Sequence, residues 1–379
     1  MYFTEIKLRN FRNYKEQTVS FHPKVNIIVG NNAQGKTNLL ESLYIMSLGK
    51  SFRTNKDAEM IGFEEGFSSA KSSYMKEGRE RSVEIILSRV GKSIIIDGSK
   101  AKKSSELLDN IYIVAFTPED MKIVKDEPEK RRRFIDRELC QLKPVYYKNL
   151  ARYKKVLMQR NSLLKEGSCN EELMETWERT LADYGSRIII ERMHFVDKIK
   201  VVSKEIHRSI TDEKEDLDLF YEASIPFVEN REELQGAFME RLKRERKRDI
   251  YRGNTGCGPH KDDLKITIDG IDVRSYGSQG QQRTAALSLK LSEIHIIREE
   301  KKEAPVLLLD DVLSELDEKR QKFLLMNLSD VQLFITTAEM KGNLWSNLPE
   351  KSVFKVEEGN ASSCSDEVLE EKRFDNNSI

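Results

Sequence analysis

Long apolar runs and paired cysteines are both missing from this sequence of 379 residues. No stretch approaches eighteen consecutive apolar residues, and the first ten residues carry charges instead of an apolar segment, so we expect neither a transmembrane helix nor a signal peptide. The four cysteines lie far apart and form no CxxC pair. This spacing argues against a disulfide framework and a zinc site, and it fits a protein of the reducing cytoplasm.

A net charge is absent as well, because Lys+Arg and Asp+Glu both number 64. Charged residues nevertheless make up 34% of the chain, which predicts long helices with exposed, charged faces. A net charge of zero does not exclude nucleic-acid binding, since local patches set the field that a nucleic acid meets. The length predicts two or three packed units.

A glycine-containing loop near the start fits the phosphate-binding pattern GxxxxGK[ST]. A short apolar run precedes it and predicts a buried strand over 25–29, and apolar residues at helical spacing predict a helix over 37–48. Strand, loop and helix therefore follow the order of a P-loop, in which backbone N–H groups point at the phosphates. The glycines would be needed because a β-carbon would block the close approach of the backbone.

The P-loop pattern predicts an ATP site. Lys36 would reach the β- and γ-phosphates, and the hydroxyl of Thr37 would coordinate Mg²⁺. Arg12 is a further candidate for contact with the nucleotide. The predicted ATP-binding residues are Gly30, Asn31, Asn32, Ala33, Gln34, Gly35, Lys36, Thr37, Asn38 and Arg12.

A second apolar run, over 306–309, ends in two carboxylates and fits a Walker B strand. Ligands bind at the carboxyl ends of strands in parallel sheets. We predict that Asp310 holds Mg²⁺ and that Asp311 orients or deprotonates the attacking water. The predicted catalytic residues are therefore Lys36, Asp310 and Asp311. Acidic residues often end strands, so this interpretation depends on the P-loop.

The segment SQGQQR begins at Ser278, about thirty residues before Asp310. A helix is predicted over 281–300, so the segment lies near a helix N-terminus, which is a second potential anion site. Alone, Ser278 is better explained as a plain N-cap. Together with the other two motifs, the segment fits the signature of an ABC-type ATPase, with Ser278, Gln279, Gly280 and Gln281 as its residues.

The pattern between the motifs predicts the domain organisation. Residues 68–116 read as β-rich, with strands over 83–87 and 93–96, whereas apolar residues at three- and four-residue steps predict amphipathic helices from 118 to about 252. We therefore predict an α/β fold in which an ABC-type ATPase head combines a mixed sheet with an antiparallel β subdomain. The predicted parts are a discontinuous head over 1–117 and 253–357, an inserted helical lobe over 118–252 and a disordered tail over 358–379.

These motifs resemble the SMC-like branch of the ABC-type ATPases, and more specifically the RecF family. The segments that carry the resemblance are LRNFRNY (8–14), KSFRT (50–54), PED (118–120), PEKRRRFID (128–136), GPHKDD (258–263) and DDVLSELD (310–317). The resemblance runs from residue 1 to about 340. The chain departs from it at Asp126 and Glu127, where the family usually has small residues.

The resemblance implies a mechanism. Two protomers would bind ATP between them, so that Ser278, Gly280 and Gln281 of one chain cap the γ-phosphate held by Lys36 of the other. ATP would close a clamp on DNA, and hydrolysis would open it. The family binds junctions of single- and double-stranded DNA, and with RecO and RecR it loads the RecA recombinase at gaps. Transport cassettes carry glutamate where this chain has Asp311, which fits a weak, DNA-stimulated ATPase.

Two basic runs on predicted helices are candidates for DNA contact, over 130–133 and 241–248. Interspersed carboxylates make a solvated helix face an equally good explanation of each run. Arg53 is a candidate for contact with the nucleotide or with DNA. The predicted DNA contacts are Lys130, Arg131, Arg132, Arg133 and Arg53.

Several aromatic residues have a simpler structural explanation. Tyr146, Tyr147 and Tyr153 lie among basic residues and could stack on bases, but packing in a core is favoured. His260 is interpreted as a structural hydrogen-bonding residue.

Two other functions remain open. A transport cassette shares the three motifs, although its switch histidine has no counterpart at Thr336–Thr337 and the charged helical insertion is large. A nucleotide-binding scaffold without useful hydrolysis is compatible with Asp311.

Overall fold

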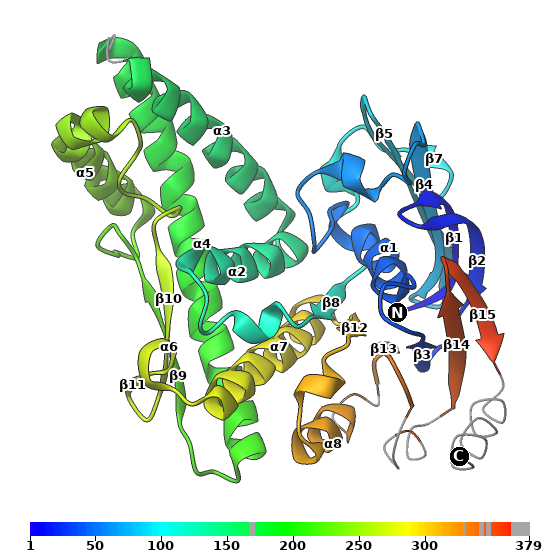
Figure 1. Ribbon diagram of the computed structural model, residues 1–379. Coiled ribbons are helices and arrows are strands. Elements are labelled where there is room, and N and C mark those ends of the chain that lie inside the picture. Colours follow the sequence, from blue (N-terminus) through cyan, green and yellow to red (C-terminus); the bar gives the residue numbers. More distant parts are fainter. Residues whose placement is uncertain (167–170, 327, 329, 341–344, 346–349, 365–379) are drawn as a thin grey trace. The chain divides into compact units, whose positions relative to one another are not determined.

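The computed structural model describes residues 1–166, 171–326, 328, 330–340, 345 and 350–364. The chain forms two compact units, of which the first comprises Met1–Asp120 with Ile297–Ile379 and the second Met121–Ile296 (Figure 1). The start of the second unit lies close to the predicted start of the helical lobe at residue 118. Residues 253–296 were predicted to belong to the head, but they lie in the second unit, where their strand pairs with a strand from the helical stretch.

The first unit contains an antiparallel sheet of six strands, in the order β2-β1-β4-β5-β6-β7. Its strands are β1 (Tyr2–Phe11), β2 (Tyr14–Ser20), β4 (Phe67–Lys76), β5 (Arg79–Ser88), β6 (Gly91–Ile96) and β7 (Ser99–Lys100). Buried and more exposed residues alternate along β4 and in the second half of β5, so that one face of the sheet joins the core.

A second six-stranded sheet of this unit has the order β15-β14-β3-β13-β12-β8. Its strands are β3 (Val25–Val29), β8 (Ile113–Phe116), β12 (Val306–Asp310), β13 (Leu333–Thr337), β14 (Lys351–Glu357) and β15 (Asn360–Cys364). All pairs are parallel except β14 with β15. The mixed sheet and the antiparallel sheet confirm the predicted α/β architecture, and β3 and β12 are buried throughout, as parallel strands are.

Helix α1 (Lys36–Leu48) contacts strands of both sheets (Figure 1). Because it is covered from two sides, it is buried around most of its circumference and has no polar stripe. Even Glu41, Ser42 and Ser47 are buried. The first residue of α1 directly follows the loop after β3, so the two sheets that cover α1 fix the position of the P-loop.

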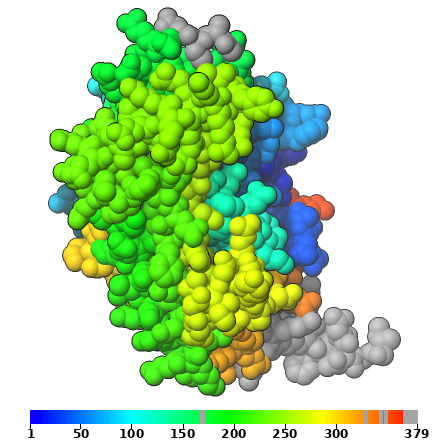
Figure 2. All heavy atoms as spheres, turned by 90° about the vertical axis from the view of Figure 1, so that its left-hand side faces the viewer, coloured from blue at the N-terminus to red at the C-terminus, as the bar shows by residue number. Residues whose placement is uncertain are grey.

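The second unit is mostly helical and contains a small antiparallel sheet in the order β11-β10-β9. Its elements are α2 (Pro128–Leu142), α3 (Pro144–Glu166), α4 (Glu171–Thr211), β9 (Leu217–Glu222), α5 (Arg231–Arg252), β10 (Asp263–Ile268), β11 (Ile271–Asp272), α6 (Val273–Tyr276) and most of α7 (Gln279–Lys301). The long helix α4 packs against α2, α3, α5 and β9. Figure 2 shows one face of this unit, with α5 in yellow-green above the yellow atoms of β10, β11 and α6.

Short helices connect the larger elements. They are η1 (Asp57–Met60), η2 (Ser104–Glu106), η3 (Asp120–Lys122), η4 (Leu313–Glu315) and α8 (Glu318–Met326). Within the described ranges, no helix combines the length and the apolar character that crossing a bilayer requires.

The stretch 118–252 is mostly helical, as predicted, and also contains the strand β9. One prediction of secondary structure was wrong. The tail from residue 358 was predicted to be disordered, yet β15 pairs with β14. The side chains of β15 are polar and largely exposed, so the strand is held by its backbone and shows no apolar pattern. The rest of that predicted tail, 365–379, lies outside the described residues.

Candidate functional site

The P-loop connects β3 to α1, and its two glycines are required by neighbouring protein atoms. Gly35 has a φ of +124°, and a β-carbon there would lie 2.7 Å from Nδ2 of Asn13. A β-carbon on Gly30 would lie 2.3 Å from the carbonyl oxygen of Val356. The prediction ascribed these glycines to the approach of a ligand, whereas the close contacts in the structure are with the protein itself.

Distant segments of the first unit hold the P-loop in place through Gln34. The side-chain amide of Asn13 donates to the carbonyl oxygen of Gln34 over 2.9 Å. At the turn between β14 and β15, the N–H of Glu358 donates to Oε1 of Gln34 over 2.7 Å. The N–H of Gly359 donates to the carbonyl oxygen of Gln34 over 3.0 Å. No sequence pattern indicates the contacts with Glu358 and Gly359, because these residues lie in the tail that was predicted to be disordered.

Lys36 lies over the loop that precedes it. Its Nζ donates to the carbonyl oxygens of Gly30 over 2.5 Å and of Asn31 over 3.0 Å. Burial lowers the pKa of Lys36, and the nearby carboxylates of Asp311 and Asp310 oppose that shift. The ammonium group is therefore held between loop carbonyls and the acidic end of β12, as a phosphate-binding lysine requires.

Asp310 brings together three segments, of which the sequence predicted two, the P-loop and the Walker B strand, to meet. The hydroxyls of Thr37 and Thr336 both donate to Oδ1 of Asp310, over 2.9 Å and 2.8 Å. Burial raises the pKa of Asp310, and these two hydrogen bonds oppose the rise. The hydroxyl of Thr37 and the carboxylate of Asp310 are hard oxygen donors, which fit Mg²⁺. Thr336 was not predicted as a site residue.

The second carboxylate stands at a sharp change of chain direction. Asp311 has a φ of +55°, which is uncommon for a residue with a side chain. Its N–H donates to Oγ1 of Thr336 over 2.8 Å, and this bond holds the turn. The side chain of Asp311 is half-buried. The strand therefore ends at Asp310, and the carboxylate that follows has a fixed backbone.

A polar cluster surrounds the beginning of α1. Nε and Nη2 of Arg12 both donate to the buried carboxylate of Glu41 over 2.8 Å. Arg53 donates to Oδ1 of Asn38 over 2.7 Å, and Asn38 donates to Oδ1 of Asn13 over 2.8 Å. Arg12, Arg53 and Asn38 are thus brought together beside the P-loop, which favours the nucleotide over DNA as the partner of Arg53.

The signature segment lies in the second unit and begins α7 with a capping box. Oγ of Ser278 accepts from the N–H of Gln281 over 3.2 Å, and Oε1 of Gln281 accepts from the N–H of Ser278 over 2.9 Å. This reciprocal pair is the S-x-x-Q arrangement that starts a helix. The cap that was weighed as a plain alternative is therefore present, and the signature role of these residues stays a prediction.

A chain of polar contacts ties the signature segment to the end of α4. Nε2 of Gln281 donates to Oε1 of Glu215 over 3.1 Å, and Oε2 of Glu215 lies 3.2 Å from Nε2 of His207. Nδ1 of the buried His207 lies 3.1 Å from Oγ of Ser288 on α7. Sequence reasoning missed Glu215 and His207, since 66 positions separate Glu215 from Gln281 and no motif joins them.

The predicted DNA contact of Arg131 was wrong. Its side chain is 2% exposed, and Nε and Nη2 form a bidentate pair with the carboxylate of Asp263 at 2.7 Å and 2.8 Å. Arg131 stands at a core position of α2 and holds β10. Its neighbour Arg132 donates to the carbonyl oxygen of Asp262 over 2.7 Å, and Arg133 pairs with Glu129 at 2.9 Å.

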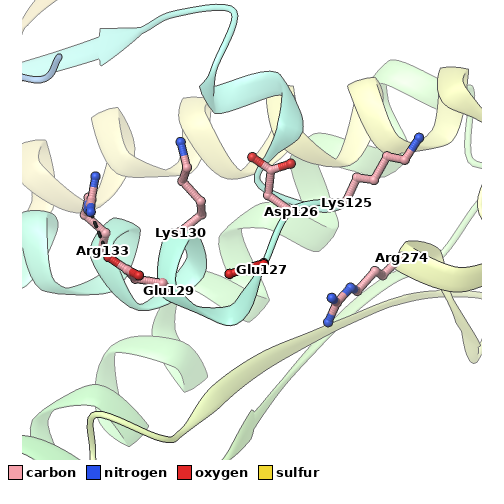
Figure 3. Close-up of a pocket in the computed structure, with 7 residues that line it drawn as sticks. All are labelled: Lys125, Asp126, Glu127, Glu129, Lys130, Arg133 and Arg274. Atoms are coloured by element: carbon pink, nitrogen blue, oxygen red, sulfur yellow. Dashed lines mark hydrogen bonds and ion pairs between the residues drawn. The ribbon is translucent and has the colours of Figure 1, made fainter.

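A cavity of about 610 Å³ lies at the beginning of α2 (Figure 3). Its lining mixes four cations with three carboxylates, so it carries little charge of one sign. The lining residues are Lys125, Asp126, Glu127, Glu129, Lys130, Arg133 and Arg274. DNA contacts of Lys130, Arg132 and Arg133 remain predictions.

The predicted core packing is confirmed for two of the three tyrosines. Tyr146 and Tyr153 are buried, whereas Tyr147 is half-buried. The hydroxyl of Tyr153 lies 2.7 Å from Nδ1 of His260, and Nε2 of His260 lies 3.0 Å from the carbonyl oxygen of Thr255. Burial lowers the pKa of His260 to about 4, so the ring is neutral at physiological pH.

Comparisons with known proteins agree with this geometry. The family model for the RecF/RecN/SMC N terminal domain matches residues 2–358. The chain is 43% identical over 362 residues to the DNA replication and repair protein RecF of Alkaliphilus oremlandii (strain OhILAs), which covers 95% of this chain and 99% of that protein. It is 44% identical over 365 residues to the protein of the same name from Clostridioides difficile (strain 630), covering 96% and 98%.

Solved structures are similar to this chain as well. A structure of the recombination mediator protein RecF-ATPrS in the RecFOR pathway matches with a TM-score of 0.89 and 38% identity, covering 96% of this chain and 98% of that one. An Smc head domain from Pyrococcus furiosus matches with a TM-score of 0.54 and 19% identity, which shows a common fold alone. The ABC-type head architecture and the resemblance that the motifs predicted are confirmed. The chain belongs to the RecF family.

Proposed function

We propose that this chain is an ATP-dependent DNA-binding protein of recombinational repair and replication. The observation that carries this proposal is the nucleotide site of the first unit, where Lys36, Thr37 and Asp310 meet around the P-loop. Relatives that share 43–44% of its residues are named DNA replication and repair protein RecF. A similar solved structure is described as RecF-ATP in the RecFOR pathway, and we extend ATP binding to this chain.

The nucleotide would be bound by residues 30–38 with Arg12. Lys36 would neutralise charge on the β- and γ-phosphates. Mg²⁺ would be held by Thr37 and Asp310, and when bound it would polarise the phosphate oxygens. Asp311 would orient the attacking water, and its short side chain on a fixed backbone fits slow hydrolysis.

ATP would also drive dimerisation. Ser278, Gln279, Gly280 and Gln281 would contact the nucleotide that a second protomer holds. The support is their position in the first turn of α7, where the partial positive charge of a helix N-terminus favours anions. A clamp of two chains would then close when ATP is bound.

The closed dimer would bind single-stranded and gapped double-stranded DNA and would act with RecO and RecR to load the RecA recombinase. This part rests on the family and on the pathway named for the similar structure. A cytoplasmic location fits the spacing of the cysteines and remains a prediction. The family assignment leaves the transport-cassette alternative without support.

Two substitutions separate the steps of this proposal. Lys36→Ala should lose ATP affinity, because the phosphates lose their only lysine partner in the P-loop motif. Ser278→Arg should keep ATP binding but lose dimerisation and hydrolysis, because a large cation would stand where the second protomer's phosphate has to enter. Titration with a fluorescent ATP analogue measures ATP binding, and sedimentation velocity measures dimerisation.

Ser209→Arg is the matched control, since it places the same side chain at an exposed serine of the same unit. It should bind ATP and dimerise as the native chain does. If Ser278→Arg also dimerises and hydrolyses ATP normally, the composite site is refuted.

A scaffold that binds ATP without useful hydrolysis is the second candidate, favoured by the aspartate at position 311. Phosphate release measured with and without DNA decides between the two. Asp310→Asn should abolish release if the chain is an ATPase. Equal, zero rates for the native chain and for Asp310→Asn would favour the scaffold.

A further inference from the structure

Helix α5 carries cations with two different surroundings. Four of them are ion-paired, in the pairs Arg231–Asp183, Arg241–Glu245, Lys243–Glu175 and Arg246–Glu178. Four others are exposed, and across the described ranges their side chains have no hydrogen-bond or ion-pair partner. These four are Arg244, Lys247, Arg248 and Arg252. The ion pairs of α5 thus leave one group of cations without a partner among the described residues.

Three of these unpaired cations lie on the same face of α5 as an exposed tyrosine. Arg244, Lys247, Arg248 and Tyr251 follow the spacing i, i+3, i+4 and i+7, which places them on one side of the helix. Tyr251 is 92% exposed. The buried residues Leu234, Phe238 and Leu242 occupy the opposite side. We refer to Arg244, Lys247, Arg248 and Tyr251 as the outer face of α5, and all four residues are exposed.

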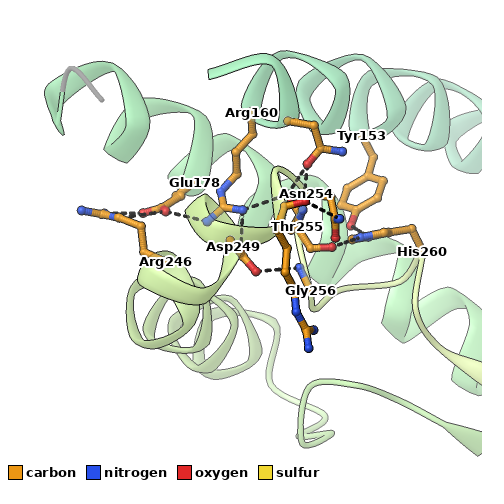
Figure 4. Close-up of polar contacts among 11 residues, drawn as sticks. Tyr153, Arg160, Glu178, Arg246, Asp249, Asn254, Thr255, Gly256 and His260 are labelled. Atoms are coloured by element: carbon orange, nitrogen blue, oxygen red, sulfur yellow. Dashed lines mark hydrogen bonds and ion pairs between the residues drawn. The ribbon is translucent and has the colours of Figure 1, made fainter. Parts of the chain in front are cut away.

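The inner side of α5 is fixed by a buried charge network (Figure 4). Arg160 is fully buried and donates to Asp249 of α5 over 2.8 Å and to Glu178 of α4 over 3.0 Å. Arg246 also pairs with Glu178. A helix held in this way presents its outer face in a constant orientation, and the residues of that face are not needed for the anchoring.

Helix stability does not explain the outer face. Cations near a helix C-terminus interact favourably with the helix dipole, but this effect fades beyond the last turn. It accounts for Arg252, which is the last residue of α5 and not part of the outer face, and it leaves the four residues of that face unexplained. An aromatic ring without packing partners among free cations is the arrangement that proteins use for single strands, where bases stack on rings and cations follow the phosphates.

We propose that the outer face of α5 binds single-stranded DNA. Arg244, Lys247 and Arg248 contact successive phosphates, and Tyr251 stacks on an unpaired base. The face spans about 10 Å along the helix, at 1.5 Å per residue, which suits a few nucleotides. Glu240 lies one turn before Arg244 and limits the site on that side. This inference rests on the proposed DNA binding and names the surface responsible for it.

Fluorescence anisotropy with the full chain, ATP and Mg²⁺ tests the proposal, using a labelled oligo-dT and a duplex of the same length. Tyr251→Ala should weaken oligo-dT binding by roughly 5- to 150-fold and leave duplex binding unchanged, because only an unpaired base can stack. Arg244→Ala with Arg248→Ala should reduce the slope of log affinity against log salt by about 1.4 on oligo-dT, for two lost phosphate contacts.

Arg79→Ala with Arg89→Ala is the matched control, since both arginines are exposed in the first unit and the change in charge is the same. This pair should bind oligo-dT like the native chain, and all variants should unfold at the native temperature. Native-like oligo-dT binding by the α5 variants, with a loss for Lys130→Ala and Arg133→Ala instead, would overturn the proposal. So would equal losses on single-stranded and duplex DNA.

A native chain that binds neither oligonucleotide would refute the proposed function itself. That outcome is distinct from native DNA binding that the α5 substitutions leave intact, which refutes the surface alone.

Discussion

The two basic runs of the second unit look alike in sequence and differ in what their cations do. In α2, Arg131 is buried in a bidentate pair with Asp263, and Arg132 donates to the backbone of Asp262. In α5, three cations of the outer face are exposed beside Tyr251. The number of cations in a run therefore does not decide how many can bind DNA, because the helical period decides which of them face the core.

The spacing of core positions explains the difference. In α2 the buried positions include Phe134, Ile135, Glu138 and Leu142, and Arg131 lies on the same side because it precedes Phe134 by three residues and Ile135 by four. In α5 the buried side is set by Phe238, Leu242 and Asp249, and the longest stretch of cations falls between those positions.

The largest effect is expected from Arg131→Met, which would break the pair that distinguishes α2. The free energy of unfolding should fall by about 3 kcal/mol or more, because the carboxylate of Asp263 loses its buried partner. Chemical denaturation of both variants measures the effect, with the exposed Arg133→Ala as a control that should change stability by less than about 1 kcal/mol. A stable Arg131→Met variant that had lost DNA affinity would show instead that Arg131 contacts DNA.

Acid is expected to affect both basic runs, because the helices that carry them are anchored on the same segment, 255–263. Asp262 and Asp263 contact arginines of α2. The hydroxyl of Thr255 accepts a hydrogen bond from Arg160, the buried residue that anchors α5, and the carbonyl oxygen of Thr255 contacts His260. The pKa of His260 is lowered from 6.5 to about 4 in the folded protein. The unfolded chain therefore binds a proton at a higher pH than the folded one, and acid favours unfolding between these values.

His260 is expected to contribute a loss of about 3 kcal/mol of unfolding free energy on going from pH 7 to pH 4, whereas buried carboxylates with raised pKa values, such as Asp262, act in the opposite direction. His260→Asn should lose less over the same range, because it has no proton to bind. Denaturant unfolding at several pH values measures both chains, and identical pH profiles would exclude His260 as the source.

The smallest effect is expected from Glu240→Lys, which would extend the outer face of α5 by one cation. Oligo-dT affinity should rise a few-fold, and the salt slope should steepen by about 0.7. Glu205→Lys makes the same change on an exposed position of α4 and should leave both quantities unchanged. Equal gains at the two positions would mean that the overall charge, not the α5 face, sets the affinity.

Much of the fold and the nucleotide site could be predicted because their signals are local. The P-loop, the Walker B strand and the signature segment are each continuous in sequence, and the structure joins Thr37 to Asp310 as predicted. The pairing of β14 with β15 could not be predicted, since β15 has polar side chains and is held by its backbone.

The burial of Arg131 was equally hidden, because its partner Asp263 is 132 residues away and the run around it is uniformly basic. The contacts of Gln281 with Glu215 and of Glu215 with His207 could not be predicted for the same reason, because they join separate segments of the chain. Hydrogen bonds between distant segments leave no periodic pattern in the sequence. A motif can therefore be predicted from the sequence, but the distant residues that orient the motif cannot.

The turn at Glu358–Gly359 has a consequence for biosynthesis. Gln34 leaves the ribosome early, but its partner Glu358 follows 324 residues later. A nascent chain therefore contains all residues of the phosphate-binding motif long before the P-loop forms its final hydrogen bonds. We expect ATP to be captured only after synthesis is almost complete, and proteolytic loss of the β14–β15 hairpin to weaken nucleotide binding although the motif remains intact.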